Sequence, residues 1–259
     1  MIEIKQLCCG YGEQPVLREL ELTLPEKDFS VLAGPNGAGK STLLYALLGF
    51  LKIQRGEIRL FGKTLGSYKR AELAHLISYV PQECVFQFDY SVTDIILMGR
   101  YPYLGLMQAW LPEDHQTVDR VLGQLDLRHL AERFFSQLSG GEKQRVLIAR
   151  ALAQDTRYIF LDETLSQLDI NHQIEIMDIL RQINHQQGKG ILLISHNLNL
   201  AANYARSMVF IREGRILGSG SPEEMMSESI LQELFGIPLP VVANPFSGKP
   251  NILYPGSIV

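Results

Sequence analysis

A glycine-rich run of eight residues, Gly34–Ser41 (GPNGAGKS), limits what this chain can fold into more than any other feature. It follows the apolar run Phe29–Ala33 and precedes a segment with helical spacing, predicted as a helix from Gly39 to about Leu48. Glycines let successive backbone N–H groups turn inward, and a helix start adds the positive end of its dipole. A strand, a phosphate-binding loop and a helix in this order predict an α/β nucleotide-binding domain.

Two side chains at the end of this run have distinct predicted roles. Lys40 is expected to reach the β- and γ-phosphates of ATP, and the Ser41 hydroxyl is expected to bind Mg²⁺. The alternative, a glycine-rich turn beside an exposed lysine, is weaker because a chance match should occur in roughly one chain per hundred. The residues of this segment predicted to bind the nucleotide are Gly34, Pro35, Asn36, Gly37, Ala38, Gly39, Lys40, Ser41 and Thr42.

A second motif, Tyr158–Glu163 (YIFLDE), is an apolar run that ends in two carboxylates. Consecutive residues of a strand point to opposite sides, so Asp162 can face Mg²⁺ while Glu163 faces an attacking water. A strand that ends in a solvated acidic turn would have the same pattern. Without the glycine-rich loop, that simpler interpretation would be preferred.

A third motif, Leu138–Glu142 (LSGGE), combines a helix start with two glycines. Ser139 followed three residues later by Glu142 is typical of a capping box, so an ordinary helix start is one interpretation. Gly140 and Gly141 also expose backbone N–H groups at a positive helix end, which makes a second anion site. One nucleotide does not need two such sites. The economical interpretation is that this helix end faces the γ-phosphate held by another copy of the chain.

Short β-rich runs alternate with helical patterns along the chain, which indicates a mostly parallel sheet covered by helices. The predicted strands are Ile2–Leu7, Leu20–Leu24, Phe29–Ala33, Ile58–Leu60, Ile77–Val80, Tyr158–Leu161, Ile191–Ser195 and Met208–Ile211. Helical spacing dominates from Cys84 to Ala153, with a helix start at Pro112, and further helices are predicted within Gln173–Ile183 and near Leu198–Ala205. We therefore predict a core of residues 1–83 and 154–220, an inserted helical subdomain of residues 84–153, and a C-terminal extension of residues 221–259 that starts with a capping box at Ser221.

Composition excludes several classes of protein. The 24 Lys and Arg residues against 28 Asp and Glu residues give a net charge of −4, so no global positive field favours nucleic acid. Cys8, Cys9 and Cys84 form neither a disulfide framework nor a metal-spaced set, which favours a reducing compartment. Met1–Leu7 lacks the pattern of a signal peptide, and no apolar stretch reaches the ~20 residues that a bilayer requires. Any membrane role is expected to come through a partner.

Taken together, GPNGAGKST, LSGGE and YIFLDE resemble the motifs of the ATP-binding cassette (ABC) ATPases, and the resemblance covers nearly the whole chain. It extends to Tyr11, placed like the adenine-stacking aromatic; to Gln82, placed like the loop glutamine; to Asp169, in the loop after the catalytic acid; and to His196, placed like the switch histidine. Taken one at a time, these could be a packed strand aromatic, a surface turn residue, a helix N-cap and a histidine at a strand end. The implied fold is α/β, a P-loop NTPase (RecA-like) core with an N-terminal antiparallel β region and an inserted α-helical subdomain.

The resemblance implies a composite ATP site between two copies of the chain. The residues implied on one copy are Lys40, Ser41, Gln82, Asp162, Glu163 and His196, and those facing them from the other are Ser139, Gly140, Gly141 and Glu142, with Tyr11 and Asp169 also at the nucleotide. Glu163 would polarise the attacking water, His196 would contact the γ-phosphate, and Mg²⁺ would be held through Ser41, Gln82 and Asp162. ATP would join the homodimer, and hydrolysis would let it separate.

The segment Val92–Gly105 resembles one branch of the family, the importers of iron-siderophore, haem and cobalamin, most closely over Gly99–Gly105. A helix ended by Gly99 and a packed aromatic turn is the alternative. Phe235–Tyr254 also looks like that branch. The resemblance implies integral membrane permease subunits as partners, a substrate-binding protein as an indirect partner, no nucleic acid, and a peripheral place on the cytoplasmic face of the inner membrane.

Two rival functions remain open from the sequence. One is a soluble ABC ATPase of iron-sulfur assembly or DNA repair. The acidic net charge disfavours DNA as its binding partner. The other is an ATP-gated scaffold with low turnover, which Glu163 disfavours.

The chain also departs from the family pattern at four positions. Thr164 and Leu165 replace the usual proline and threonine, Asn197 stands where aspartate is common, and Glu142 stands where glutamine is frequent.

Overall fold

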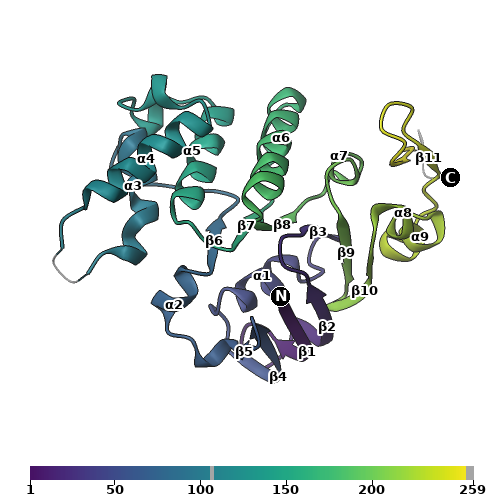
Figure 1. Ribbon diagram of the computed structural model, residues 1–259. Helices are drawn as coiled ribbons and strands as arrows, with labels where there is room; N and C mark the ends of the chain where they lie inside the picture. Colours follow the sequence, from purple (N-terminus) through teal and green to yellow (C-terminus); the bar gives the residue numbers. More distant parts are fainter. Residues whose placement is uncertain (106–107, 255–259) are drawn as a thin grey trace. The chain divides into compact units, whose positions relative to one another are not determined.

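The computed structural model describes residues 1–105 and 108–254, which divide into two compact units (Figure 1). The first unit comprises Met1–Lys69 and the described part of Gly190–Val259, and the second comprises Arg70–Lys189. The predicted boundaries at 83/84 and 153/154 both fall inside the second unit, because two strands cluster there with the helical segment. The division into core, helical subdomain and extension stays a prediction.

An antiparallel sheet forms the N-terminal part of the first unit. In its second strand, Leu20, Leu22 and Leu24 are buried while the residues between them are exposed, as expected for a sheet with one face in the core. The predicted antiparallel region is confirmed, and its first two strands are longer than predicted. The four strands, in the spatial order β2-β1-β4-β5, are β1 (Ile2–Cys9), β2 (Leu17–Leu24), β4 (Ile53–Leu60) and β5 (Lys63–Thr64), and a 3₁₀ turn, η1 (Leu65–Ser67), follows β5.

Parallel strands form the core of the first unit. Strand β3 pairs in parallel with β8 on one side and β9 on the other, and β10 adds to β9 in the antiparallel sense. Every residue of β3 and β8 is buried, which is typical of parallel strands covered on both faces. The elements are β3 (Phe29–Ala33), α1 (Lys40–Leu47), β8 (Gly190–Ile194), α7 (Leu198–Ala202), β9 (Ser207–Arg212) and β10 (Arg215–Gly220).

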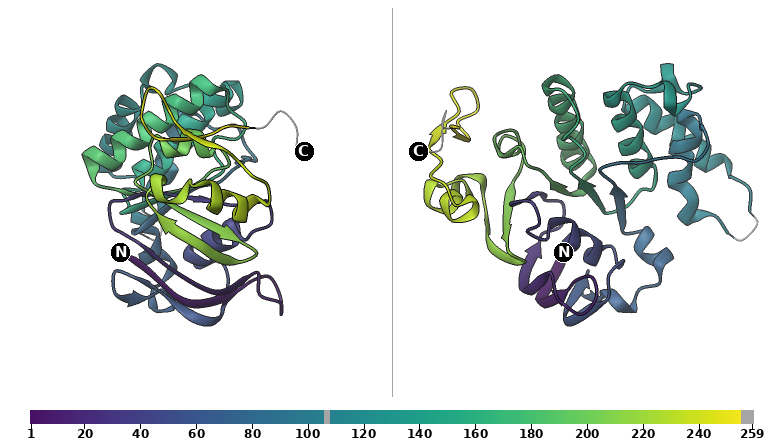
Figure 2. Two further views of the ribbon diagram at one scale, coloured as in Figure 1. Left: turned by 90° about the vertical axis from the view of Figure 1, so that its right-hand side faces the viewer. Right: turned by 180° about the vertical axis from the view of Figure 1, so that it is seen from behind.

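The C-terminal part of the first unit consists of two short helices and a hairpin. Helix α8 begins in the predicted capping box, where the Ser221 Oγ accepts a hydrogen bond from the Glu224 N–H at 3.3 Å. Figure 2 shows α8 and α9 beside β9 and β10. The elements are α8 (Pro222–Met225), α9 (Glu228–Phe235), β11 (Val241–Ala243) and β12 (Pro250–Ile252).

This hairpin is fastened to α7. The side chain of Asn199 donates to the Ile252 carbonyl oxygen at 3.0 Å and accepts from the Ile252 N–H at 2.7 Å. The Asn199 side-chain amide thus makes the same pair of hydrogen bonds to Ile252 that a residue of a neighbouring strand would make. The end of the hairpin is therefore paired with a helix that begins two residues after His196.

The second unit contains two parallel strands, a helical segment that lies between them in the sequence, and one helix at each end of the unit. Strands β6 and β7 pair from Ile77 opposite Tyr158 to Val80 opposite Leu161. In the helical segment, α3, α4 and α5 pack on one another and bury apolar side chains such as Ile95, Val121 and Val146. The elements are α2 (Arg70–Ala74), β6 (Ile77–Val80), α3 (Val92–Leu97), η2 (Met98–Tyr103), α4 (Pro112–Gln124), η3 (Arg128–Leu130), η4 (Phe135–Gln137), α5 (Gly140–Ala153), β7 (Tyr158–Asp162) and α6 (Ile170–Gln187).

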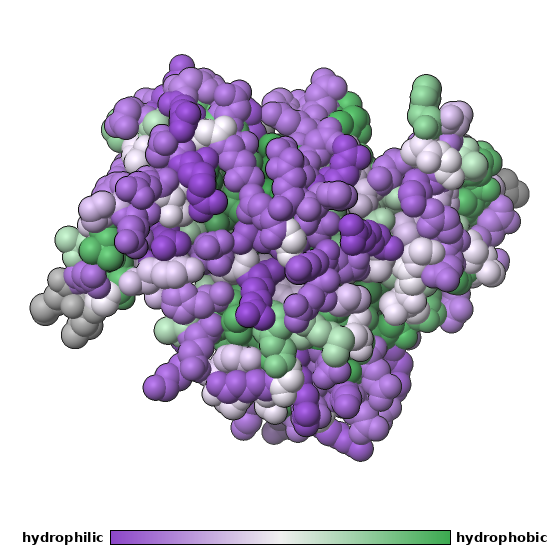
Figure 3. All heavy atoms as spheres, viewed as in Figure 1, coloured by the Kyte–Doolittle hydropathy of each residue, from purple (hydrophilic) through white to green (hydrophobic). Residues whose placement is uncertain are grey.

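Across residues 1–105 and 108–254, no helix combines the length and the apolar character that crossing a membrane requires. The face drawn in Figure 3 is mostly hydrophilic, with apolar side chains gathered in small areas. The apolar side chains of this chain belong mainly to its buried core.

Candidate nucleotide-binding site

The glycine-rich loop joins β3 to α1, and its backbone conformation requires glycine at several positions. Gly37 and Gly39 have φ angles of 75° and 104°, in the region that side chains strongly disfavour. A Cβ added at Gly34 would lie 2.1 Å from the Ile211 carbonyl oxygen, so β9 presses directly on the loop. Gly39 is also the N-cap of α1, so no cap side chain covers the helix start. The loop therefore has the geometry of an anion cradle.

Lys40 places a buried positive charge in this cradle. Its side chain is 5% exposed, and its Nζ donates to the carbonyl oxygens of Gly34 and Pro35, at 3.0 Å each. Burying an ammonium group is unfavourable unless carbonyl dipoles or an anion compensate it. The Lys40 charge is held inside the loop by the loop's own backbone, where phosphate oxygens are expected.

Two other predicted site residues, Tyr11 and His196, lie in the same unit as Lys40. Tyr11 follows β1 in a turn and is 59% exposed, so the interpretation as a packed strand aromatic is wrong. His196 is exposed just after β8. Asn197, which departs from the family pattern, caps α7 by accepting a hydrogen bond from the Leu200 N–H at 3.0 Å. The roles of Tyr11 and His196 toward a nucleotide stay predictions.

In the second unit, Asp162 is the last residue of one strand and Gln82 lies just after the end of its neighbour. Asp162 ends β7 and is 4% exposed, and the Tyr79 hydroxyl donates to its Oδ2 at 3.5 Å. Gln82 is exposed two residues beyond the end of β6. Because β6 and β7 are parallel and in contact, both side chains lie at the carboxyl end of the strands. This edge is where ligand-binding groups gather in α/β proteins.

Glu163 occupies a strained position next to Asp162. Its φ angle is 48°, in the left-handed region that few residues other than glycine adopt. The turn that follows is closed by the Ser166 N–H and Oγ, which donate to the Glu163 carbonyl oxygen at 3.1 and 2.9 Å. Thr164, one of the departures from the family pattern, is 5% exposed, and among the described residues its hydroxyl has no hydrogen-bond partner. The backbone at Glu163 and the turn after it are thus held by the hydrogen bonds from Ser166.

The LSGGE segment forms the capping box that the sequence predicts. The Ser139 Oγ accepts from the Glu142 N–H at 3.3 Å, and the Glu142 carboxylate accepts from the Ser139 N–H at 2.7 Å. The hydrogen bond from the Ser139 N–H, and then one from the Ser139 side chain, hold the pKa of the Glu142 carboxyl below its ordinary value. Gly140 and Gly141 open α5 directly after the cap. The Glu142 carboxylate is engaged by its own helix start, while its predicted part in nucleotide binding is untested.

Asp169 is the N-cap of α6, as its structural interpretation predicts. Its Oδ1 accepts from the His172 N–H at 3.0 Å, and its Oδ2 lies 2.9 Å from the His172 Nδ1. The bond from the His172 N–H, and then that from its ring, hold the pKa of Asp169 below its ordinary value. No role was predicted for His172, although a histidine three residues after a capping aspartate is a visible signal.

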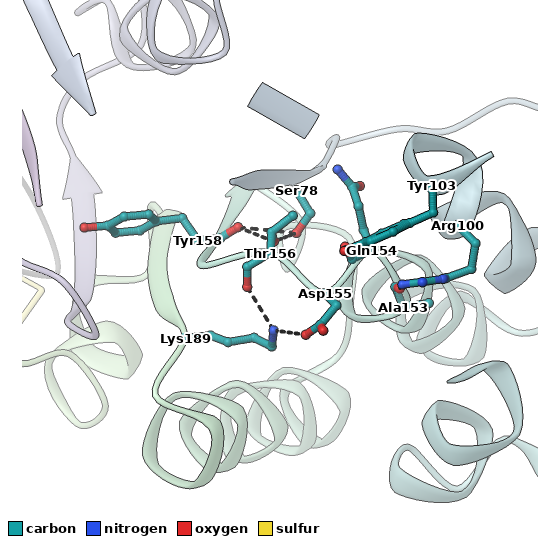
Figure 4. A network of polar contacts seen from close by, with 9 residues as sticks. All are labelled: Ser78, Arg100, Tyr103, Ala153, Gln154, Asp155, Thr156, Tyr158 and Lys189. Atoms are coloured by element: carbon teal, nitrogen blue, oxygen red, sulfur yellow. Dashed lines mark hydrogen bonds and ion pairs between the residues drawn. The ribbon is translucent and has the colours of Figure 1, made fainter. Parts of the chain in front are cut away.

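A polar network at the C-terminal end of α5 was not predicted from the sequence (Figure 4). Arg100 donates from its Nε to the Asp114 Oδ1 at 2.9 Å and from its Nη1 to the Ala153 carbonyl oxygen at 2.9 Å, and it lies 3.7 Å from the centre of the Tyr103 ring. Burial opposes ionisation of Asp114, but hydrogen bonds from Arg100 and the Leu111 N–H keep its pKa below the ordinary value. The run Gly99–Gly105, which resembles the importer branch, is thus anchored by a buried ion pair at Arg100.

A second cation fixes the chain where α5 ends. The Lys189 Nζ contacts the Asp155 Oδ1 at 2.8 Å and the Thr156 carbonyl oxygen at 2.9 Å. The Thr156 hydroxyl in turn donates to the Ser78 Oγ at 3.0 Å (Figure 4). The turn between α5 and β7 is therefore tied both to β6 and to the end of α6.

The predicted site residues fall into two sets, one in each unit. The first unit holds the glycine-rich loop, Tyr11 and His196, and the second holds Gln82, Asp162, Glu163, Asp169 and the residues from Ser139 to Glu142. A cradle for anions with a buried lysine, on an α/β core, defines the class of P-loop nucleotide-binding proteins.

Comparison with known proteins identifies the family within that class. The family model described as ABC transporter matches residues 17–166. The achromobactin transport ATP-binding protein of Dickeya dadantii (strain 3937) is 38% identical over 249 residues, 96% of this chain and 93% of that protein. The hemin import ATP-binding protein of Escherichia coli O157:H7 is 36% identical over 259 residues, 98% of this chain and 99% of that protein.

A solved structure agrees with these relatives. A chain of an ABC transporter assigned to the metal-chelate type, in an inward-facing conformation, has a TM-score of 0.85 and 29% identity, covering 97% of this chain and 96% of that one. This chain belongs to the ABC transporter family, as one of its ATPase subunits. The resemblance, the fold class and the enzyme class predicted from the sequence are confirmed.

Proposed function

We propose that this chain is the ATP-hydrolysing motor subunit of an importer for metal chelates such as iron-siderophore complexes, haem or cobalamin. The observation that carries the proposal is the buried Lys40 in the glycine-rich loop, together with relatives that match almost the full length of the chain. The relatives cited are ATP-binding proteins of achromobactin transport and hemin import. The segment around Gly99 and the C-terminal segment from Phe235 to Tyr254 are the sequence features that favour this branch.

The site residues are proposed to act as follows. The backbone N–H groups from Gly34 to Thr42 and the Lys40 ammonium bind the phosphates, and Tyr11, exposed after β1, stacks on the adenine. Glu163 accepts a hydrogen bond from the attacking water and orients it, and His196 donates to the γ-phosphate. Each group binds or orients one part of the substrate.

The donor set also fits magnesium. Ser41, Gln82 and Asp162 offer a hydroxyl, an amide and a carboxylate oxygen, which are the ligand types that Mg²⁺ prefers. Asp162 is buried at the end of β7 beside the Tyr79 hydroxyl, a setting that fixes a carboxylate in one orientation. When bound, Mg²⁺ would offset the charge that develops on the phosphates.

A second copy of the chain is proposed to complete the site. Gly140 and Gly141 begin α5 after the Ser139 cap, so this helix start presents backbone N–H groups to an anion. In the proposed homodimer it faces the γ-phosphate bound by the other copy, with Asp169 nearby. ATP then stabilises the closed dimer, and loss of the phosphate lets it open.

The proposed dimer works beneath permease subunits, with a substrate-binding protein as an indirect partner and no nucleic acid. This gives the chain a peripheral place on the cytoplasmic face of the inner membrane.

The rival functions are weaker than the importer function. The net charge of −4 disfavours DNA as a partner, and an intact Glu163 disfavours a scaffold with little turnover.

Two measurements test the proposal. The tagged chain is purified from detergent-solubilised membranes and its partners are identified, and its MgATP hydrolysis is then measured. We expect a polytopic membrane protein and steady ATP turnover. Recovery of iron-sulfur assembly or DNA repair proteins in place of a permease would contradict the importer, and binding of ATP without turnover would favour the scaffold.

A further inference from the structure

His172, in the first turn of α6, bridges two of the motifs described above. Its backbone N–H and its ring Nδ1 contact the two oxygens of Asp169, at 3.0 and 2.9 Å. An exposed aspartate is ionised at neutral pH, so the Asp169 carboxylate can only accept hydrogen bonds. The Nδ1 of His172 must therefore carry a proton, which fixes the orientation of the ring.

The other edge of this ring packs against Gly141. A Cβ added at Gly141 would lie 2.2 Å from the His172 Cδ2 and 2.8 Å from its Nε2, closer than atoms can approach. Gly141 is buried, whereas the His172 side chain is 38% exposed. The imidazole thus occupies the space that any side chain at position 141 would need, and it determines where the first turn of α5 can lie.

Further contacts join the starts of α5 and α6. A Cβ added at Gly140 would be 3.6 Å from the Leu168 Cδ2, an ordinary van der Waals contact. The Arg145 Nη1 lies 3.0 Å from the Glu175 Oε1, and the Arg145 side chain is 14% exposed. The starts of the two helices are therefore linked by an ion pair as well as by the His172 ring.

The same turn of α6 also holds the loop that follows Glu163. The Gln173 Nε2 donates to the carbonyl oxygens of Leu165 and Leu168, at 3.1 and 2.9 Å. The Ser166 hydroxyl donates to the Glu163 carbonyl oxygen at 2.9 Å. A continuous series of hydrogen bonds and packing contacts therefore runs from the backbone of Glu163 to α6 and, through His172, to Gly141.

We propose that His172 is a positioning residue of the ATPase reaction, which holds the Asp169 loop and the Gly141 turn in one fixed geometry. This inference rests on the proposed function, in which the start of α5 binds the γ-phosphate held by another copy. The ring does not have to touch the nucleotide. It sets the place of the N–H groups that do, and a shift of about 1 Å at such groups can lower a rate about a hundredfold.

Two substitutions separate the two contacts of the ring. His172→Asn keeps a donor for Asp169 and removes the ring from Gly141, and His172→Phe keeps a ring and removes the donor. We expect each to lower kcat for MgATP hydrolysis by about tenfold to a hundredfold, with KM and ATP affinity within about twofold of wild type. The control is His185→Asn, on the exposed side of the last turn of α6, which should match wild type.

Several outcomes overturn the proposal. A kcat within about twofold of wild type in either variant excludes positioning through that contact, and a rise in KM with unchanged kcat would place His172 in ground-state binding. Lys40→Ala is measured alongside them. If Lys40→Ala keeps full turnover, the proposed function itself is wrong; if it abolishes turnover while the His172 variants remain normal, only the positioning role is wrong.

A thermal unfolding experiment tests the ring contact without using activity. Gly141→Ala is introduced into the wild type and into a His172→Ala background. The added carbon meets the ring in the first case, and the ring is absent in the second, so we expect a smaller decrease in unfolding midpoint in the His172→Ala background. Equal decreases in both backgrounds would show that the ring does not restrict position 141.

Discussion

Two Arg–Asp pairs of the second unit allow the effect of burial on an ion pair to be measured. The Arg100 Nε lies 2.9 Å from Asp114, and the Arg128 Nη2 lies 2.8 Å from Asp119, so the distances are almost equal. The side chains of the first pair are 11% and 5% exposed, and those of the second are 62% and 68% exposed. The exposure of the charged side chains therefore differs far more than the distance between them.

Arg100→Ala should therefore be far more harmful than Arg128→Ala. Removing one partner of a buried pair leaves the other charge uncompensated and destabilises by about 3–5 kcal/mol, whereas an exposed pair contributes less than about 1 kcal/mol. In a chain of this size each kcal/mol lowers the unfolding midpoint by about 2–4 °C. The expected decrease is thus about 6–20 °C for Arg100→Ala, and below about 4 °C for Arg128→Ala.

The measurement is the thermal unfolding midpoint by circular dichroism near pH 7 and again at acid pH. The pKa of Asp114 is lowered in the folded state, so its contribution is complete above its unfolded pKa and is lost as the pH falls through the folded pKa. The difference between the wild type and Arg100→Ala should shrink in acid. Equal midpoints for Arg100→Ala and Arg128→Ala near pH 7 would refute this reasoning.

Three further predictions concern the site. Glu163→Gln should leave ATP binding intact, lower turnover about a hundredfold or more and accumulate an ATP-bound dimer, as steady-state kinetics and gel filtration would show; normal turnover would contradict the role of Glu163. Lys40→Ala should weaken ATP binding in calorimetry because a buried cation of the cradle is lost, and unchanged affinity would argue against a phosphate contact. Thr164→Val should raise the unfolding midpoint, since it removes a buried hydroxyl whose desolvation destabilises by about 1–3 kcal/mol; a lower midpoint would indicate an unseen partner.

The features that could be predicted from the sequence are those specified by neighbouring residues. The glycine-rich loop, the Ser139 capping box and the Asp169 cap each depend on groups within a few positions, so short motifs identify them. For Asp169 the local interpretation was the one observed. Local patterns also located the buried β3 strand without change of bounds.

Features that depend on packing between distant segments were missed. The Arg100–Asp114 pair joins residues 14 apart in the sequence, and the Lys189–Asp155 pair joins residues 34 apart. Neither pairing has a local signal. Strand β10 was missed for a different reason: its glycines weaken the strand pattern, although the turn residues Glu213 and Gly214, both with positive φ angles, indicate a hairpin.

The reciprocal bonds between Asn199 and Ile252 have a consequence for how the molecule is made. A ribosome adds Ile252 fifty positions after it completes α7 at Ala202, so the helix that follows His196 lacks this support during synthesis. Fragments cut short before β12 would carry every motif of the cassette and still lack that support. Cellular proteases that remove partly folded chains would meet an unsupported α7 in such fragments, so intact motifs alone would not guarantee their survival.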